Sequence, residues 1–375
     1  MQNPSSLLFA ALLASSSFAA RPEASASAHG VSFLGAWPHH ILVIDEQHEQ
    51  VVDRIDIGDD VPMQLMLSPS HKKLYAVTSR NSEIVTVDIQ TRKMVDSFHL
   101  DEGGMQYRLA TGALDSDGKL MYTIVRPTVK KQDRFTIDSP KFLVIDLAQH
   151  KIVRSVEFPT DADAFGLGGL YVEYALRLSP KSKYLYMFRS DSILVFSTAD
   201  FKQIDKIELA KPMFPGLQSV SLNLGNDADR YPGFVTSVFV AADPVVHRPV
   251  FGIARMNLST REIDFKPVGP YTNRIMNLWV TPDRSKGYTV SITGSEGNKR
   301  SEFWVFDMNT NQLIRKAEFP GRRRFDVALS PSGKSLYIYV AGYQVECYDP
   351  ETLKLTKVID LNADSTSNMV MIPGV

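Results

Sequence analysis

Apolar and polar positions alternate along the chain in short runs, and one arrangement of these runs recurs. In the clearest copy, residues 64–100, an apolar strand ends in Leu67-Ser68-Pro69 and a turn leads into a second strand that begins Lys-x-Leu-Tyr. A third strand ends at Asp88, and a short polar turn leads into a fourth. Alternation with a period of two in runs of this length is typical of half-buried β-strands. The pattern therefore predicts four antiparallel strands per repeat.

The repeat occurs again at 174–209 and 325–361, with more degenerate copies at 107–158, 219–267 and 276–319. The predicted third strands end at seven marks: Asp45, Asp88, Asp146, Ser197, Asn257, Asp307 and Asp349. Neighbouring marks are 42 to 60 residues apart. Seven four-stranded units of this size predict an all-β fold, a seven-bladed β-propeller.

The two ends of the chain complete the count. The first unit has strands within 31–57 but lacks the strand that should precede them, whereas 367–373 (SNMVMIP) is an unmatched strand. This strand aligns with 62–69 (PMQLMLSP), a first strand, so we expect the C-terminal strand to complete the first blade. Closure of this kind leaves no open sheet edge at the seam of the ring. The predicted propeller domain spans residues 29–375.

The recurring residues themselves have structural interpretations. Asp, Asn and Ser are turn formers, so the residue at each mark is predicted to cap a turn rather than to titrate in catalysis. Five tyrosines recur at one position of the repeat and are predicted to pack between blades: Tyr75, Tyr122, Tyr186, Tyr288 and Tyr337.

Composition restricts the function and the compartment. The 41 Lys and Arg residues balance 42 Asp and Glu residues, which disfavours a nucleic-acid-binding protein. No apolar run reaches the roughly 18 residues of a membrane span. Residues 7–20 (LLFAALLASSSFAA) form an apolar stretch that ends in small residues, which predicts a signal peptide and linker over 1–28 and a periplasmic or secreted protein. The alternative is an Ala/Ser-rich tail, since no Lys or Arg precedes the stretch.

One face of the predicted disc carries the long connections. In a four-stranded blade, the loop between strands two and three shares a face with the loops between blades. The long loops predicted there are 126–140, 241–249 and 293–301, together with the blade-to-blade loop 160–171. Because most loops in compact domains are short, several long ones on one face predict a binding surface.

This face is also rich in basic residues, which favours an anionic ligand or an acidic partner. The alternative is solvated charge without a common role. The candidate ligand- or partner-binding residues are Arg108, Arg126, Lys130, Lys131, Arg134, His247, Arg248, Arg274, Arg322, Arg323 and Arg324.

Motifs that carry chemistry are scarce. The sequence contains no P-loop, no Gly-x-Ser-x-Gly elbow and no Cys-x-x-Cys-His haem site. The eight histidines show no metal-ligand spacing, and His39-His40 is interpreted as a surface pair. Asp115 to Gly118 opens like a calcium loop, but Arg126 stands where that loop needs Glu, so we interpret it as a β-turn. No catalytic residue, metal site or cofactor of this chain is predicted.

The repeat resembles the YVTN propellers of bacterial envelopes. Residues 117–147 and 348–375 resemble the β subunit of quinohemoprotein amine dehydrogenase, and a looser resemblance runs from about Trp37 to the end. The resemblance implies a non-catalytic propeller subunit in a periplasmic heterotrimer. Its partners would be a di-haem cytochrome c carrying haem c and a small subunit carrying cysteine tryptophylquinone. The lone cysteine, Cys347, is not a quinone candidate because it belongs to a repeat strand.

Two other functions stay open. The chain could be a stand-alone envelope YVTN-type propeller that binds a protein or a small anionic ligand. It could also be an independent hydrolase or lyase that uses the central funnel, although the missing acid–base constellation disfavours this.

Overall fold

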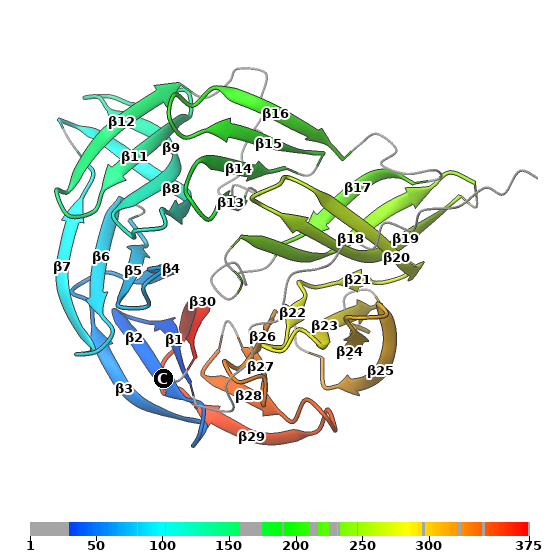
Figure 1. Cartoon of the computed structure of the whole chain (residues 1–375). Helices are drawn as coiled ribbons and strands as arrows, with labels where there is room; N and C mark the ends of the chain where they lie inside the picture. Colours follow the sequence, from blue (N-terminus) through cyan, green and yellow to red (C-terminus); the bar gives the residue numbers. More distant parts are fainter. Residues whose placement is uncertain are drawn as a thin grey trace, which may run out of the picture.

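The protein is described by a computed structural model that covers residues 30–80, 82–101, 103–157, 175–189, 191–209, 217–224, 231, 233–245, 247–294, 297–321, 324–339 and 342–373. These residues are all-β and form seven small antiparallel sheets in a ring, so the predicted seven-bladed propeller is confirmed (Figure 1). The described part of the chain has no apolar helix of membrane-spanning length. The predicted leader, 1–28, lies outside the described residues.

Within each blade the strands follow one another from the axis of the ring outward. Blade 1 contains β30 (Ser365–Ile372), β1 (Val31–Ala36), β2 (His40–Asp45) and β3 (Gln50–Asp56). Blade 2 contains β4 (Pro62–Leu67), β5 (Lys73–Thr78), β6 (Glu83–Asp88) and β7 (Lys93–His99). Blade 3 contains β8 (Met105–Leu114), β9 (Leu120–Lys130), β10 (Phe135–Ile137), β11 (Lys141–Asp146) and β12 (Lys151–Glu157).

Blade 4 contains β13 (Ala175–Leu178), β14 (Tyr184–Phe188), β15 (Ser192–Ser197) and β16 (Gln203–Glu208). Blade 5 contains β17 (Gln218–Asn223), β18 (Phe234–Asp243), β19 (Arg248–Asn257) and β20 (Ile263–Pro270). Blade 6 contains β21 (Arg274–Ile275), β22 (Trp279–Val280), β23 (Lys286–Thr293), β24 (Arg300–Asp307) and β25 (Gln312–Phe319). Blade 7 contains β26 (Asp326–Leu329), β27 (Leu336–Tyr339), β28 (Gln344–Tyr348) and β29 (Leu355–Asp360).

The C-terminal strand closes the ring, as predicted. In Figure 1, β30 at the red end of the chain lies beside β1 at the blue end. The two strands pair antiparallel, with Val31 opposite Ile372 and Leu34 opposite Met369. Blade 1 is thus made from both ends of the chain, which gives β1 a partner on each side.

Alternation along each strand joins every blade to both of its neighbours. In β11, Leu143 and Ile145 pack with side chains of blade 2, whereas Phe142 and Val144 pack with those of blade 4. Six apolar clusters of this kind connect the blades around the whole ring. The five recurring tyrosines are buried in these contacts, as predicted. Two of them donate hydrogen bonds across a blade boundary, Tyr75 to the carbonyl of Gly118 and Tyr186 to that of Leu258.

The seven marks cap turns, as predicted. At each mark a side-chain oxygen accepts a hydrogen bond from a backbone N–H two or three residues later, for example Asp307 from Asn309 and Thr310. The residue four positions after each mark has a positive φ: Glu49, Arg92, His150, Phe201, Arg261, Asn311 and Leu353. This is the geometry of a type I turn followed by a bulge, which connects the third and fourth strands.

Candidate functional site

The second-to-third-strand connections and the blade-to-blade connections share one side of the disc, which we call the hairpin face. The seven marks lie at the opposite face, so extra length in strands two and three extends the hairpin face. β1 and β2 pair over 6 residues and β14 and β15 over 5, whereas β18 and β19 pair over 10 and β23 and β24 over 8. Blades 3, 5 and 6 therefore project, and these are the blades for which long connections were predicted.

The projecting segment of blade 3 is folded, and its prediction as an irregular loop, 126–140, is wrong. β9 runs to Lys130, turns at 131–134, and pairs back through β10, with Thr128 opposite Ile137 and Lys130 opposite Phe135. The N–H of Lys131 donates to the carbonyl of Arg134 at 2.8 Å and closes the turn. Continued pairing satisfies backbone groups, and the β-branched residues of this segment favour it. We call residues 126–138 the blade-3 arm.

The blade-3 arm presents apolar side chains to solvent. Phe135 is 61% exposed and Ile137 is 64% exposed, and their i, i+2 spacing places both on one side of β10. Lys130 and Lys131 beside them are also exposed. Exposed aromatic and aliphatic side chains are typical of a protein-binding surface.

The structure brings five of the candidate basic residues together in blade 3. Arg108 in β8 lies directly opposite Arg126 in β9, which places the two side chains on the same side of the sheet. Lys130, Lys131 and Arg134 follow on the arm, and Arg134 forms an ion pair with Asp133 at 3.1 Å. Arg108 and Arg126 thus place two guanidinium groups on one side of the blade-3 sheet.

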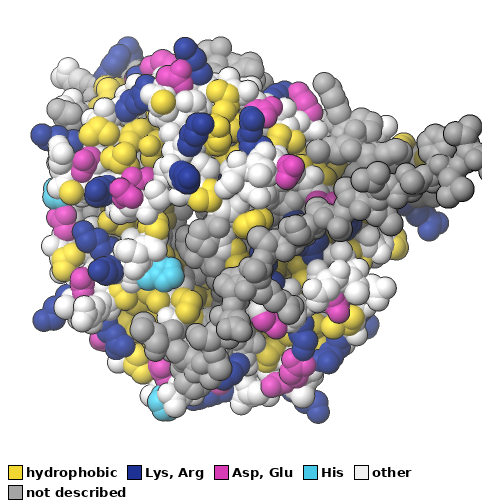
Figure 2. Space-filling model, in the orientation of Figure 1, with side chains coloured by type: hydrophobic (Ala, Val, Ile, Leu, Met, Phe, Trp, Pro, Cys, Tyr) yellow, Lys and Arg dark blue, Asp and Glu magenta, His cyan; other side chains and the backbone are white. Residues whose placement is uncertain are grey.

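The other candidate basic residues are spread over three further blades. His247 and Arg248 are exposed at the tip of the β18–β19 hairpin, where Arg248 lies opposite Asp243. Arg274 begins β21 and Arg324 precedes β26, and both are exposed. Arg322 and Arg323 lie outside the described residues. Figure 2 shows Lys and Arg interspersed with Asp and Glu across the face in view, so positive charge does not dominate that face.

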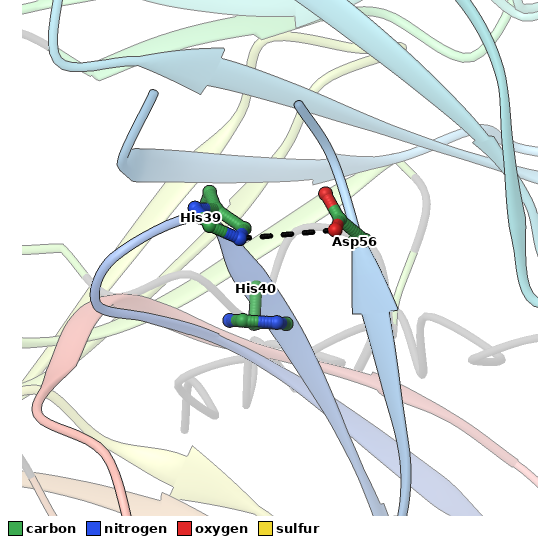
Figure 3. A group of neighbouring side chains, drawn as sticks. All are labelled: His39, His40 and Asp56. Atoms are coloured by element: carbon green, nitrogen blue, oxygen red, sulfur yellow. Dashed lines mark ion pairs between the residues drawn. The ribbon is translucent and has the colours of Figure 1, made fainter. Parts of the chain in front are cut away.

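A second group on the hairpin face joins the turn between β1 and β2 to the end of β3. His39 and His40 have ring centroids 4.5 Å apart, and His39 Nε2 lies 3.7 Å from Asp56 Oδ2 (Figure 3). Burial lowers the pKa of His40, and the neighbouring His39 and Arg54 lower it further. The Asp56 carboxylate has the opposite effect and raises it, but the net shift is downward. The sequence interpretation of His39-His40 as a simple surface pair missed Asp56. The feature that brings Asp56 to the two histidines is the register of the β2–β3 hairpin, which places His40 opposite Asp56.

Two ionisable groups near the seam of the ring, Asp326 and Cys347, have shifted pKa values because they are buried in the fold. Burial raises the pKa of Asp326, against hydrogen bonds from the N–H of Val327 and the hydroxyl of Tyr339. The Tyr339 oxygen also accepts from the N–H of Met369 in β30, so this pair fastens blade 7 to blade 1. Cys347 is fully buried in β28, and burial raises the pKa of its thiol far above the usual range.

A groove of about 650 Å³ lies at the outer rim between blades 5 and 6. Phe251 and Trp304 contribute aromatic surface to it, and the Lys316 ammonium lies 4.3 Å from the Trp304 ring centroid. None of the candidate basic residues of the hairpin face lines this groove.

Comparison with known proteins supports the fold. No protein-family model matches the chain, and a comparison with curated proteins found no match. A functionally unknown protein from Desulfotomaculum acetoxidans DSM 771 is similar in structure, with a TM-score of 0.56 and 12% identity over 92% of this chain and 99% of that one. The dihydro-heme d1 dehydrogenase NirN, in complex with DHE, gives a TM-score of 0.53 and 15% identity over 94% of this chain and 77% of that one. Hydrazine synthase from Kuenenia stuttgartiensis gives a TM-score of 0.48 and 14% identity over 83% of this chain and 95% of that one.

At these identities the likeness concerns the fold alone, and the class of protein is the seven-bladed β-propeller. The resemblance to the amine dehydrogenase β subunit stays a prediction.

Proposed function

We propose that this chain is a non-catalytic propeller subunit of a cell-envelope redox complex and that the blade-3 arm docks an acidic partner. The observation that carries the proposal is the composition of the arm: Phe135 and Ile137 are exposed beside Lys130 and Lys131. Aromatic side chains that fill a partner's pocket supply most of the affinity of an interface, and charges at the rim supply steering.

The partner class follows from the resemblance to quinohemoprotein amine dehydrogenase. It is a di-haem cytochrome c, with a small quinone-bearing subunit as the third component. Haem c and cysteine tryptophylquinone would then be carried by these partners. The similar structure NirN is a dihydro-heme d1 dehydrogenase, so this fold occurs in a protein of haem chemistry. This supports the choice of a haem protein as the partner.

Within this complex the chain would act as a rigid platform. Its cores connect every blade to the next, so a partner bound to the hairpin face meets a surface that the whole ring holds in place. Cys347 is buried in β28, which removes its thiol from cross-linking chemistry and leaves the redox groups to the partners.

The test is recovery of the native complex from the cell envelope. The protein is purified under gentle conditions from the envelope fraction of its source and passed over a size-exclusion column. We expect a species larger than the monomer that shows the visible absorption of haem c. Recovery of the chain as a monomer without haem absorption would overturn the proposal.

The same preparation tests export. We expect amino-terminal sequencing to find a mature chain that begins between 21 and 29. An intact Met1 form recovered from the cytoplasm contradicts an envelope location.

A stand-alone propeller that binds a small anion is the second candidate. The observation that favours it is the opposition of Arg108 and Arg126 on neighbouring strands. Calorimetric titration with inorganic phosphate tests it. Saturable binding that is lost in Arg108→Gln supports this function, and the absence of binding removes it without affecting the partner proposal.

A further inference from the structure

The hairpin-face end of blade 1 brings two consecutive histidines together with an aspartate from the end of β3, giving three potential metal ligands. His39 is the last residue of the turn that follows β1, His40 begins β2, and Asp56 ends β3. Their candidate donor atoms, one per side chain, all lie within 4.8 Å of one another. Figure 3 shows the His39 ring beside the Asp56 carboxylate, with the His40 ring next to both.

Backbone pairing fixes this arrangement. His40 and Asp56 are directly opposite in the β2–β3 ladder, so their side chains leave the sheet on the same side. The N–H of Ile57 donates to the carbonyl of His39 at 3.0 Å, which ties the turn to the end of β3. The backbone atoms that set the positions of the three side chains are therefore held by the blade rather than by a free loop.

We propose that His39, His40 and Asp56 bind a divalent transition-metal ion, Zn²⁺ or Cu²⁺, and leave at least one coordination position open. Two imidazole nitrogens and one carboxylate oxygen form a ligand set typical of zinc sites that keep a fourth position for water or a substrate. Imidazole ligands favour Zn²⁺ and Cu²⁺, whereas Mg²⁺ and Ca²⁺ prefer oxygen ligands.

The distances are close to those that such a site needs. Metal–ligand bonds of about 2.0–2.2 Å in a tetrahedron place the donor atoms roughly 3.4 Å apart. His39 Nε2 and Asp56 Oδ2 are already 3.7 Å apart. The Asp56 side chain is 67% exposed and the imidazoles are half-buried, so side-chain rotation can bring the donor atoms closer.

Two other histidine–aspartate pairs among the described residues lack this convergence. His48 lies 2.6 Å from Asp45, and His150 lies 2.6 Å from Asp96 with its ring stacked on Phe98. Among the described residues, His39, His40 and Asp56 are the one group of three metal-ligating side chains whose donor atoms converge. The pair of His150 and Asp96 is therefore a matched control.

The open coordination position would let a bound metal ion contact a ligand or a partner. It faces the same side of the disc as the blade-3 arm, because the β1–β2 turn is a second-to-third-strand connection. A bound ion there could accept a donor atom from a ligand or a partner. This role is independent of the basic arm, and metal binding can be measured with neither the arm nor a partner involved.

The test uses purified protein without a polyhistidine tag, titrated with ZnCl₂ in a calorimeter. We expect one Zn²⁺ per chain and binding weaker by about tenfold or more in His39→Gln and in Asp56→Asn. His150→Ala should bind as the wild type does, and MgCl₂ should give no heat at this site. Bound Co²⁺ should show the strong visible absorption of a tetrahedral site, which Asp56→Asn weakens.

Folding is checked for each variant by circular dichroism. Because His39 lies in a turn and the Asp56 side chain is largely exposed, both variants are expected to keep the wild-type spectrum. A wild-type protein that binds no Zn²⁺ overturns the proposal. So do folded His39→Gln and Asp56→Asn variants that bind Zn²⁺ as tightly as the wild type.

Discussion

The residue at each mark stabilises the turn that starts the outermost strand. Asp349 shows the role fully, because its Oδ1 accepts from the backbone N–H groups of Glu351 and Thr352 and from the Thr352 hydroxyl. These hydrogen bonds lower the pKa of Asp349. The recurrence of aspartate at these marks is thus explained by the hydrogen bonds of the turn.

Replacing one of these caps should cost stability at a single turn. We expect Asp349→Ala to lower the free energy of unfolding by about 0.5–1.5 kcal/mol, because the turn loses its side-chain acceptor. Urea denaturation measures the change. Asp349→Asn, which keeps an acceptor oxygen, is the control and should lose less; equal losses would show that the cap hydrogen bonds do not matter.

Asp60, in the connection between blades 1 and 2, is a carboxylate with several hydrogen bonds. It is 8% exposed, and its carboxylate accepts from the Ser79 hydroxyl at 2.5 Å and from the N–H groups of Val61 and Arg80 at 2.8 and 3.1 Å. Burial alone would raise its pKa. The hydrogen bonds, including one from Thr78, outweigh burial and lower the pKa to about 2.

This pKa gives a signed prediction for acid stability. Because the folded pKa is below the unfolded value of 3.8, the carboxylate stabilises the fold above about pH 4 and loses that contribution as pH falls toward 2. A shift of this size corresponds to roughly 2 kcal/mol. Asp60→Asn should therefore unfold more easily at pH 7 and show a weaker fall in stability between pH 4 and 2.

The neighbouring Asp59 supplies the control, because its side chain is exposed. Asp59→Asn should leave both the stability at pH 7 and its acid dependence close to those of the wild type. If both substitutions change the melting temperature equally, the bonds of Asp60 are not the cause.

At the scale of elements, the blade-3 arm distinguishes this propeller from a plain ring. A basic arm steers an acidic partner, and rim charges of this kind act mainly on the association rate. We expect Lys130→Glu together with Lys131→Glu to slow association with the haem-containing partner and to flatten the salt dependence of the rate. Stopped-flow measurements at several ionic strengths test this.

The matched control reverses two lysines on the opposite face, Lys72 in the turn before β5 and Lys73 at the start of β5. Their reversal should leave association unchanged, although Lys73 faces Asp88 across the strands and its variant is also checked for stability. If this control loses association while the arm variant keeps it, the partner binds the face opposite the hairpin face, and the proposal is wrong.

At the scale of the whole molecule, β30 decides whether the ring closes. Met369, Val370 and Ile372 are buried by at least 92%, and they pack with blades 7, 1 and 2. Side chains also link blades 1 and 7, since Glu46 accepts from the N–H of Ser332 and Glu49 from the Ser335 hydroxyl.

Deletion of residues 365–375 should remove the folded monomer. Burial of each large apolar side chain contributes about 1.5–3 kcal/mol, so the loss approaches the roughly 5–15 kcal/mol that a typical protein has in total. It also exposes the edge of β1, which favours aggregation. Thermal melting and light scattering measure both effects. A deletion variant that melts like the full chain would show that β30 does not close the ring. The single substitution Met369→Ala should lower the free energy of unfolding by only about 2–5 kcal/mol.

The sequence by itself determined the number of blades, the capped turns and the closure by the last strand. Each of these depends on local spacing: a period of two along a strand, turn residues at fixed offsets, and a first unit that lacks one strand while the C-terminus has one unmatched strand. Local rules of backbone geometry make such patterns readable without knowing which blades touch. The same patterns could not show that 126–140 continues as strands, because pairing beyond the disc depends on β8 and β9 already lying side by side.

Only the tertiary structure brought the functional candidates together. Arg108 and Arg126 become neighbours through the register of two long strands, and Asp56 joins His39 and His40 through the β2–β3 ladder. A bulge between Val43 and Ile44 shifts that ladder by one residue, and such a shift changes every pairing beyond it. Residue type and spacing fix which side chains are available, whereas strand register fixes which of them meet, because a side chain's neighbours lie across the sheet rather than along the chain.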